Sequence, residues 1–284
     1  MPYARIIALT SFAMLAFAGN SLLCRLALKH TTIDAASFTT IRLLSGAVVL
    51  WLVVWMRNGA QSGRGNWLSA FALFIYAAGF SFAYMSLPAA TGALLLFGAV
   101  QVTMIGYGFW VGERFIKLQV VGLVLAFGGI VALLLPGLSA PPLSGSVLML
   151  CAGVAWGIYS LRGKGAGDPT KVTAGNFLRA TPIAVALSLI MLNHASLDSA
   201  GFWYAISSGA LASGIGYAIW YTALPALKAK NAATVQLSVP VIAALGGIIF
   251  LGEPINLRLV MSSIAILGGI ALVIWEKQHV SGTR

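Results

Sequence analysis

Polar and aromatic residues interrupt several long apolar segments of the sequence, and their chemistry is that of ligand binding. Amide side chains away from water need hydrogen-bond partners, and a cavity lined by aromatic rings suits a large neutral or zwitterionic ligand. Paired aromatics three residues apart share a helix face. The predicted binding residues are Asn20, Tyr84, Gln101, Trp156, Tyr159, Tyr217, Trp220 and Gln236. For each amide, the alternative role of joining two helices stays open.

Arg42 and Arg179 each lie about seven residues into an apolar segment. Burying an arginine in a membrane costs at least ~2.5 kcal/mol, so each needs a reason. One interpretation is that they attract a carboxylate of the ligand. The other, which we prefer, is that they reach the interface or bond to nearby carbonyls and stabilise the fold.

The acidic residues all lie in loops or at the ends of apolar segments, at Asp34, Glu113, Asp168, Asp198, Glu253 and Glu276. A proton-coupled exchanger of cations usually needs a carboxylate near the membrane midplane. The sequence therefore argues against that class. Glu113 and Glu253 are instead expected to open helices, where the helix dipole favours a carboxylate.

Other reactive side chains form no recognisable site. Two cysteines fall in apolar segments and three histidines in loops or the tail, at Cys24, Cys151, His30, His194 and His279. This spacing fits neither a disulfide framework nor a metal site. No catalytic residue, metal or cofactor is predicted.

The composition identifies the environment that positions these residues. Of 284 residues, 60% are apolar and 8% are charged, against about 25% charged in a soluble domain. The net charge of +11 comes from basic residues in short loops, where they orient membrane spans. We therefore expect a lipid bilayer, and no nucleic acid, as partner.

Apolar windows of about 20 residues, each long enough to cross the bilayer, predict an all-α integral membrane protein with ten transmembrane helices. Continuous rather than alternating apolar runs exclude a barrel. The predicted spans are 6–27, 35–56, 67–87, 89–110, 115–135, 143–162, 171–192, 201–223, 230–250 and 256–275. Of the lysines and arginines in loops, twelve lie on the side of the membrane that holds both termini, and three lie on the opposite side. This bias predicts cytoplasmic termini in a multi-pass protein of a bacterial-type inner membrane.

The two halves of the chain repeat short motifs in the same order. The motif beginning at Tyr84 and ending at Pro88 recurs at Tyr221 to Pro225, and Gly112-Glu113 recurs at Gly252-Glu253. We expect one repeat over 1–138 and a second over 139–284. Five spans per repeat make the second one inverted, an arrangement typical of secondary transporters. A duplicated membrane protein that moves nothing is the alternative.

With ten spans, a five-plus-five inverted repeat and Gly-Glu after the fourth and ninth spans, the chain resembles the drug/metabolite transporter superfamily, EamA family. The segments Ala155-Trp156-Gly-Ile-Tyr159 and Gly216-Tyr217-Ala218-Ile-Trp220 are similar to exporters of aromatic amino acids of the YddG type, although the first half departs from them. The resemblance implies export of amino acids or similar small neutral or zwitterionic metabolites by alternating access. The missing midspan carboxylate leaves either movement as an uncoupled uniporter or coupling through a group that the sequence does not identify. The oligomeric state, monomer or homodimer, is left open.

Three alternatives to amino-acid export are kept. Within transport, the cargo could be other hydrophobic metabolites or drugs. A membrane-embedded enzyme would need clustered His, Asp or Glu at an interface, and we find none in the sequence. A structural or receptor subunit usually carries a sizeable soluble domain.

Overall fold

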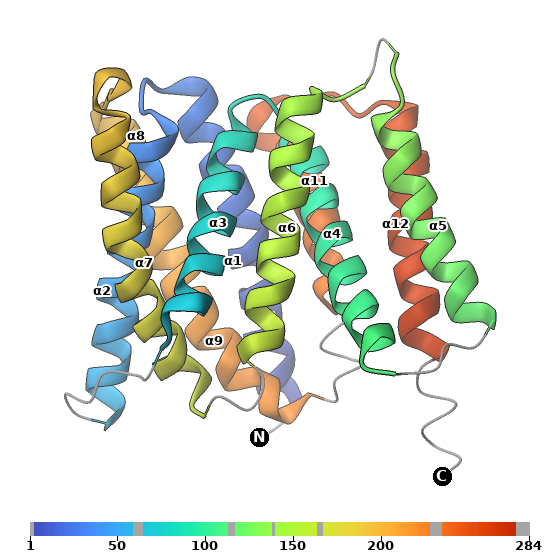
Figure 1. The fold of residues 1–284 in the computed structure, drawn as a ribbon, viewed down its shortest axis with the longest axis horizontal. Helices are drawn as coiled ribbons and strands as arrows, with labels where there is room; N and C mark the ends of the chain where they lie inside the picture. Colours follow the sequence, from blue (N-terminus) through green and yellow to red (C-terminus); the bar gives the residue numbers. More distant parts are fainter. Residues whose placement is uncertain are drawn as a thin grey trace.

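Helices make up the regular structure of the described residues. The computed structural model describes residues 3–58, 65–112, 117–137, 140–163, 167–227 and 235–276, and no strand occurs among them (Figure 1). The α-helices are α1 (Tyr3–His30), α2 (Ala35–Asn58), α3 (Trp67–Tyr84), α4 (Ala89–Trp110), α5 (Lys117–Leu134), α6 (Leu143–Gly163), α7 (Pro169–Ile190), α8 (Ser199–Ser207), α9 (Gly216–Ala223), α11 (Ser238–Leu251) and α12 (Leu257–Glu276). A π-helix, η2 (Ser208–Ile215), joins α8 to α9, and short 3-10 turns follow α7 and α9.

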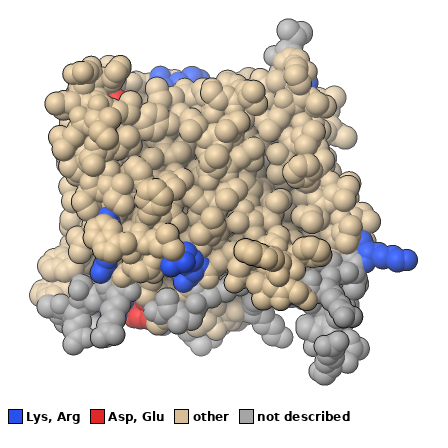
Figure 2. All heavy atoms as spheres, viewed as in Figure 1, with Lys and Arg blue, Asp and Glu red and all other residues tan. Residues whose placement is uncertain are grey.

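The predicted all-α membrane fold is confirmed. Eight of the described helices are long and apolar enough to cross a membrane. The continuous segment α8–η2–α9 and the shorter α11 supply the other two of the ten spans. Figure 2 shows the matching surface, with a broad band that lacks charged side chains and with lysine, arginine and acidic residues toward its two edges. Such a band suits hydrocarbon, which offers no hydrogen-bond partners.

Helix ends fall where the polar breaks of the sequence lie. Asn66 caps α3 by accepting a hydrogen bond from the Ser69 amide, and Asp168 caps α7 by accepting from the Thr170 amide. Such side-chain acceptors satisfy amides that have no partner within the helix. Pro88 precedes α4, and Gly252 ends α11 at a φ of 61°, a conformation that glycine adopts most easily.

Helix packing follows the same pattern in both halves of the chain. α3 and α4 pack against α6, and in the same way α9 and α11 pack against α1. α2 pairs with α7, and α5 pairs with α12. If the helices α1–α5 correspond in order to the helices α6–α12, each of these contacts has an equivalent that is formed by the corresponding helices. The predicted division between residues 138 and 139 lies outside the described residues and stays a prediction.

The two ends of the bundle are distinct. α1 begins and α12 ends at the same face, drawn at the bottom of Figure 1, which we call the terminal face. The other face, where α1 ends at His30 and α2 begins at Ala35, we call the opposite face. There the loops of the two halves are joined, because the Ser196 amide donates to Asp34 and the Thr32 amide to Asp198.

The pair α5 and α12 meets at two glycines whose backbones touch. A Cβ built on Gly269 would lie 2.4 Å from the carbonyl oxygen of Gly122, and one built on Gly122 would lie 2.5 Å from that of Gly269. At the neighbouring Gly268, a Cβ would meet nothing within 4 Å. Close backbone approach through small residues is a common way for membrane helices to pack.

Gly269→Ala is therefore expected to lower the free energy of unfolding by about 1–3 kcal/mol, because the added methyl forces α5 and α12 apart. Gly268→Ala is the matched control and should be neutral or slightly stabilising, since alanine favours the helix. Thermal unfolding of the two purified variants in detergent measures both effects. Equal stability of the two variants would contradict the packing described.

Candidate functional site

A cavity of about 480 Å³ lies between the helices of both halves. Its lining comes from α1, α3, α4, α6, α7, η2, α9 and the segment before α11. The cavity reaches the terminal face, because Gly163, Gly167 and Pro169 belong to its lining and are exposed at the end of α6 and the start of α7. It extends inward as far as Phe80 and Leu96.

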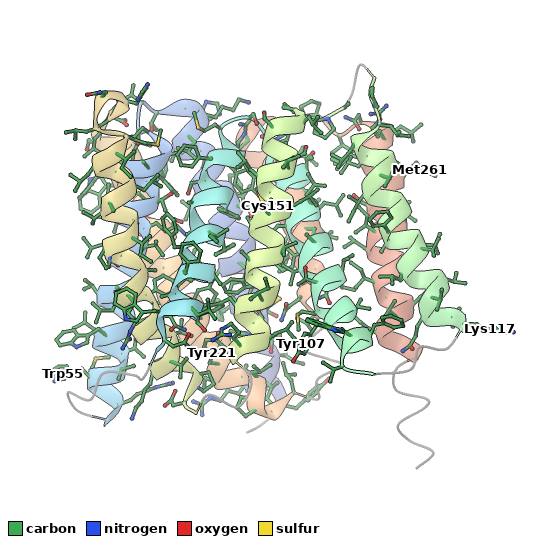
Figure 3. The ribbon with its side chains drawn as sticks, viewed as in Figure 1. Trp55, Tyr107, Lys117, Cys151, Tyr221 and Met261 are labelled. Atoms are coloured by element: carbon green, nitrogen blue, oxygen red, sulfur yellow. The ribbon has the colours of Figure 1, made fainter. Side chains whose placement is uncertain are left out.

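Most of the predicted binding residues lie in the wall of this cavity. The seven that line it are Asn20, Gln101, Trp156, Tyr159, Tyr217, Trp220 and Gln236. They come from both halves of the chain. Tyr221, which the sequence analysis used only as part of the repeated motif, also lines it, toward the terminal face (Figure 3).

Tyr84 lies elsewhere. Its side chain is fully buried, its hydroxyl is 3.3 Å from the carbonyl oxygen of Ala89 at the start of α4, and its ring packs edge-on against Phe80. It is absent from the cavity lining. Tyr84 therefore packs between the inner end of the cavity and the opposite face.

Stacked aromatic rings form one side of the cavity. Trp156 is at the centre, with its ring centroid 4.7 Å from that of Tyr76, 5.2 Å from that of Tyr159 and 5.4 Å from that of Tyr217. Phe17 packs against Tyr217 at 5.5 Å and against Trp220 at 6.1 Å. Offset and edge-to-face rings of this kind are mutually stabilising and form a rigid apolar wall.

Hydrogen-bonding groups sit among these rings. Asn20 Oδ1 accepts from Ser208 Oγ at 2.6 Å, which leaves the Asn20 amide NH₂ to donate elsewhere. Asn176 Nδ2 donates to Tyr159 Oη at 3.3 Å. Ser213 Oγ, on the π-helix, is buried and has no partner among the described residues. π-helical turns are often found at functional sites.

Tyr76, Asn176 and Ser213 line the cavity and are not among the residues predicted from the sequence. Asn176 carries the signal used for the other amides, a polar group inside an apolar span. Tyr76 is an aromatic residue inside an apolar span, as the selected tyrosines are, so the same signal could have found it. Ser213 carries no such signal, since serine is common in spans as a packing residue.

The two intramembrane arginines occupy different environments. Arg42 on α2 is 1% exposed and donates from Nη2 to Tyr76 Oη at 2.9 Å. Arg179 on α7 is half-buried and donates from Nη1 to the carbonyl of Gly175, one turn back in its own helix. Neither lines the cavity directly.

At the opposite face, a buried ion pair closes the bundle. Arg25 Nε is 3.0 Å from Glu253 Oε1, with the two side chains 8% and 6% exposed. Arg25 Nη1 also donates to the carbonyls of Tyr84 and Met85, and the Ala89 amide donates to Glu253 Oε2 at 2.7 Å. This network, the Arg25–Glu253 latch, ties α1 to the end of α3, the start of α4 and the segment after α11.

The expectation that Glu253 opens the last helix is wrong. α12 begins at Leu257, and Asn256 accepts from the Leu259 amide there. Glu253 accepts instead a hydrogen bond from the backbone amide of Ala89, the first residue of α4. Its carboxylate therefore interacts favourably with the N-terminus of α4 and not with that of α12. Its repeat counterpart, Glu113, lies outside the described residues.

The terminal face holds a different arrangement at the end of α6. Arg162 follows Arg25 by 137 residues, the offset at which the tyrosine motif repeats. It donates to Ser69 Oγ at 3.2 Å and to Asn66 Oδ1 at 3.4 Å, at the start of α3. One end of the bundle is thus joined by a buried ion pair, and at the other the cavity is open.

Comparison with known proteins assigns a family to this architecture. The model of the EamA-like transporter family matches residues 4–135 and, a second time, residues 143–275. An uncharacterized protein of Pseudomonas aeruginosa is 58% identical over 96% of this chain and 96% of its own. The threonine/homoserine exporter RhtA of Escherichia coli is 33% identical, over 49% of this chain and 48% of its own.

A similar fold is found among solved structures. One such structure aligns with a TM-score of 0.70 at 18% identity and covers 97% of this chain and 99% of that one. At this identity the likeness concerns the fold alone. The two family matches together span nearly all of the described helices.

Proposed function

This chain belongs to the EamA-like transporter family, and from that premise we propose that it exports amino acids or similar small neutral or zwitterionic metabolites through the cavity between its halves. The observation that carries the proposal is a cavity lined by aromatic rings and amides, whose described lining residues reach the terminal face and include none from the loops at the opposite face. The proposed substrate-binding residues are Asn20, Gln101, Trp156, Tyr159, Tyr217, Trp220 and Gln236.

The chemistry of the lining supports this class of cargo. No aspartate or glutamate is among the residues described as lining the cavity, so no carboxylate there can be shared between a proton and a cation. Aromatic rings and amide groups instead suit an uncharged or zwitterionic molecule. The similarity to an exporter of threonine and homoserine over half the chain supports amino acids, and the ring cluster around Trp156 supports aromatic ones.

The proposed mechanism is alternating access. In the present conformation the cavity opens at the terminal face, and the Arg25–Glu253 latch lies between it and the opposite face. Transport then requires the latch to open while the terminal face closes, a change for which inverted repeats provide two related packings. With cytoplasmic termini, as the basic residues predict, this conformation faces inward and loads cargo for export. We propose uncoupled movement, since the lining residues that the structure describes include no proton-binding carboxylate.

Other functions have weaker support. The apolar wall would also receive other hydrophobic metabolites or drugs, and this is the second candidate. The family membership supports transport over a membrane-embedded enzyme or a structural subunit.

A proteoliposome assay tests the proposal. Purified protein is reconstituted, and the movement of labelled L-phenylalanine, L-leucine and L-threonine is followed with and without a pH gradient. We expect at least one amino acid to move down its concentration gradient at a rate that the pH gradient leaves unchanged. If none of the three amino acids moves, the amino-acid proposal is refuted. If the rate rises when a pH gradient is applied, the uncoupled mechanism is refuted.

A further inference from the structure

Arg42 is a buried cation with most of its hydrogen-bonding capacity unused. Its Nε and Nη1 atoms are inaccessible and have no partner among the described residues. Its guanidinium carbon lies 5.2 Å from the ring centroid of Tyr76 and 4.8 Å from that of Phe80. Two cation–π contacts and one hydrogen bond offset only part of the cost of removing this charge from water.

The described part of the protein provides no anion to balance this charge. The one ion pair found there joins Arg25 to Glu253. At the opposite face, Asp34 accepts from the Ser37 amide in the first turn of α2 and from the Ser196 amide, and Asp198 accepts from the Thr32 amide. Asp168 caps α7 at the terminal face. Because interactions between charges are strong where the effective dielectric constant is low, the uncompensated guanidinium makes its surroundings attractive to a negative group.

Tyr76 connects this charge to the cavity. Its side chain lines the cavity, packs against Trp156 and accepts a hydrogen bond from Arg42 Nη2. A hydroxyl that accepts from a cation still has its own O–H to donate, and Tyr76 donates to no acceptor among the described residues. The polarised hydroxyl is therefore a strengthened donor in the cavity wall.

We infer that the cavity selects substrates that carry a carboxylate, which Tyr76 Oη binds as donor while Arg42 behind it supplies the balancing charge. Tyr76 is then a substrate-binding residue and Arg42 a positioning residue. The aromatic cluster around Trp156 receives the apolar remainder of the molecule. The inference rests on the proposed role of the cavity in transport and adds the chemical group that it recognises.

Matched ligands test the selection. Binding to the purified full-length protein is measured for L-phenylalanine and L-phenylalaninamide, L-leucine and L-leucinamide, and 3-phenylpropionate and 3-phenylpropionamide. In each pair a neutral amide replaces the carboxylate. The wild-type protein should bind at least one carboxylate about ten-fold more tightly than its amide, or about 1.4 kcal/mol.

The variants test the residues. Tyr76→Phe keeps the ring and removes the donor. The ratio of carboxylate to amide affinity should fall toward one, because the charged carboxylate loses more from the missing donor than the neutral amide does. Arg42→Met should do the same, and Arg42→Lys should retain part of the preference. Tyr221→Phe also removes a hydroxyl from the lining, and it should leave the preference intact.

The outcomes separate this inference from the proposed function. Equal binding of carboxylate and amide in all pairs, or an unchanged preference in Tyr76→Phe, would overturn the inference and leave amino-acid export standing if the proteoliposomes move an amino acid. Selective binding of 3-phenylpropionate alone would support the inference and count against amino acids as cargo.

Discussion

Replacing Trp156 with alanine should lower transport of an aromatic amino acid at limiting concentration roughly ten-fold or more. Trp156 contacts Tyr76, Tyr159 and Tyr217 at centroid distances between 4.7 and 5.4 Å, so its removal takes away the centre of the ring cluster. An aromatic pair contributes about 0.5–1.5 kcal/mol beyond the area that it buries, and a ligand ring lost from this wall forfeits at least one such pair.

Initial rates in proteoliposomes, normalised to folded protein, measure the loss. Trp156→Phe keeps a ring at this position and should retain more of the activity. Trp110→Ala is the matched control, because Trp110 is 85% exposed at the end of α4 and lies outside the lining. Equal rates for Trp156→Ala and Trp110→Ala would exclude Trp156 from the substrate site.

The second large effect is expected from Glu253→Gln. The carboxamide of the introduced glutamine can still accept a hydrogen bond from the Ala89 amide. It carries no charge, however, so the Arg25 guanidinium stays buried without a counter-ion. Removing one partner of a buried ion pair costs about 3–5 kcal/mol. That cost falls on the conformation in which the latch is closed. A conformation that admits water to Arg25 avoids it, so the population should shift toward opening at the opposite face.

Cys24, buried beside Arg25 on α1, reports this opening. In a Cys151→Ser background it is the one remaining cysteine of the two in the sequence. Its labelling by a water-soluble maleimide should be roughly ten-fold faster with Glu253→Gln, since a shift of 1.4 kcal/mol is already ten-fold. Asp198→Asn removes a carboxylate from the same face without breaking the latch and should leave labelling slow. Unchanged labelling in a folded Glu253→Gln protein would show that the latch does not hold this face closed.

Much of the architecture was predictable because membrane spans are local features. A run of about 20 apolar residues has one way to satisfy its backbone in hydrocarbon, which is to form a helix across it. The polar breaks at Asn66, Pro88 and Asp168 mark where helices begin for equally local reasons. The sequence predicts the span that runs from Ser199 to Ala223, but it does not predict the π-helical middle of that span. No residue type there specifies a π-helical turn.

The site was predictable only in part. Polar and aromatic residues inside a span stand out in the sequence, and seven of the eight selected ones line the cavity. Tyr84 met the same criterion and lies outside it. Tyr76 lines the cavity, although it is a tyrosine within a predicted span just as Tyr84 is, and only Tyr84 belongs to the repeated motif. The helices that carry these residues are apolar on nearly all sides, so periodicity does not mark the face that turns toward a cavity.

The sequence alone therefore determined the environment, the ten spans, the repeat and the absence of a carboxylate within them, because each depends on composition and spacing along the chain. Only the tertiary structure decided which residues meet. It stacked Tyr217 on Trp156, paired Glu253 with Arg25 and separated Arg42, buried behind Tyr76, from Arg179, bonded to its own helix. The physical reason is that the rotation of each helix about its axis is set by its neighbours, and for these spans the neighbours come from the other half of the chain.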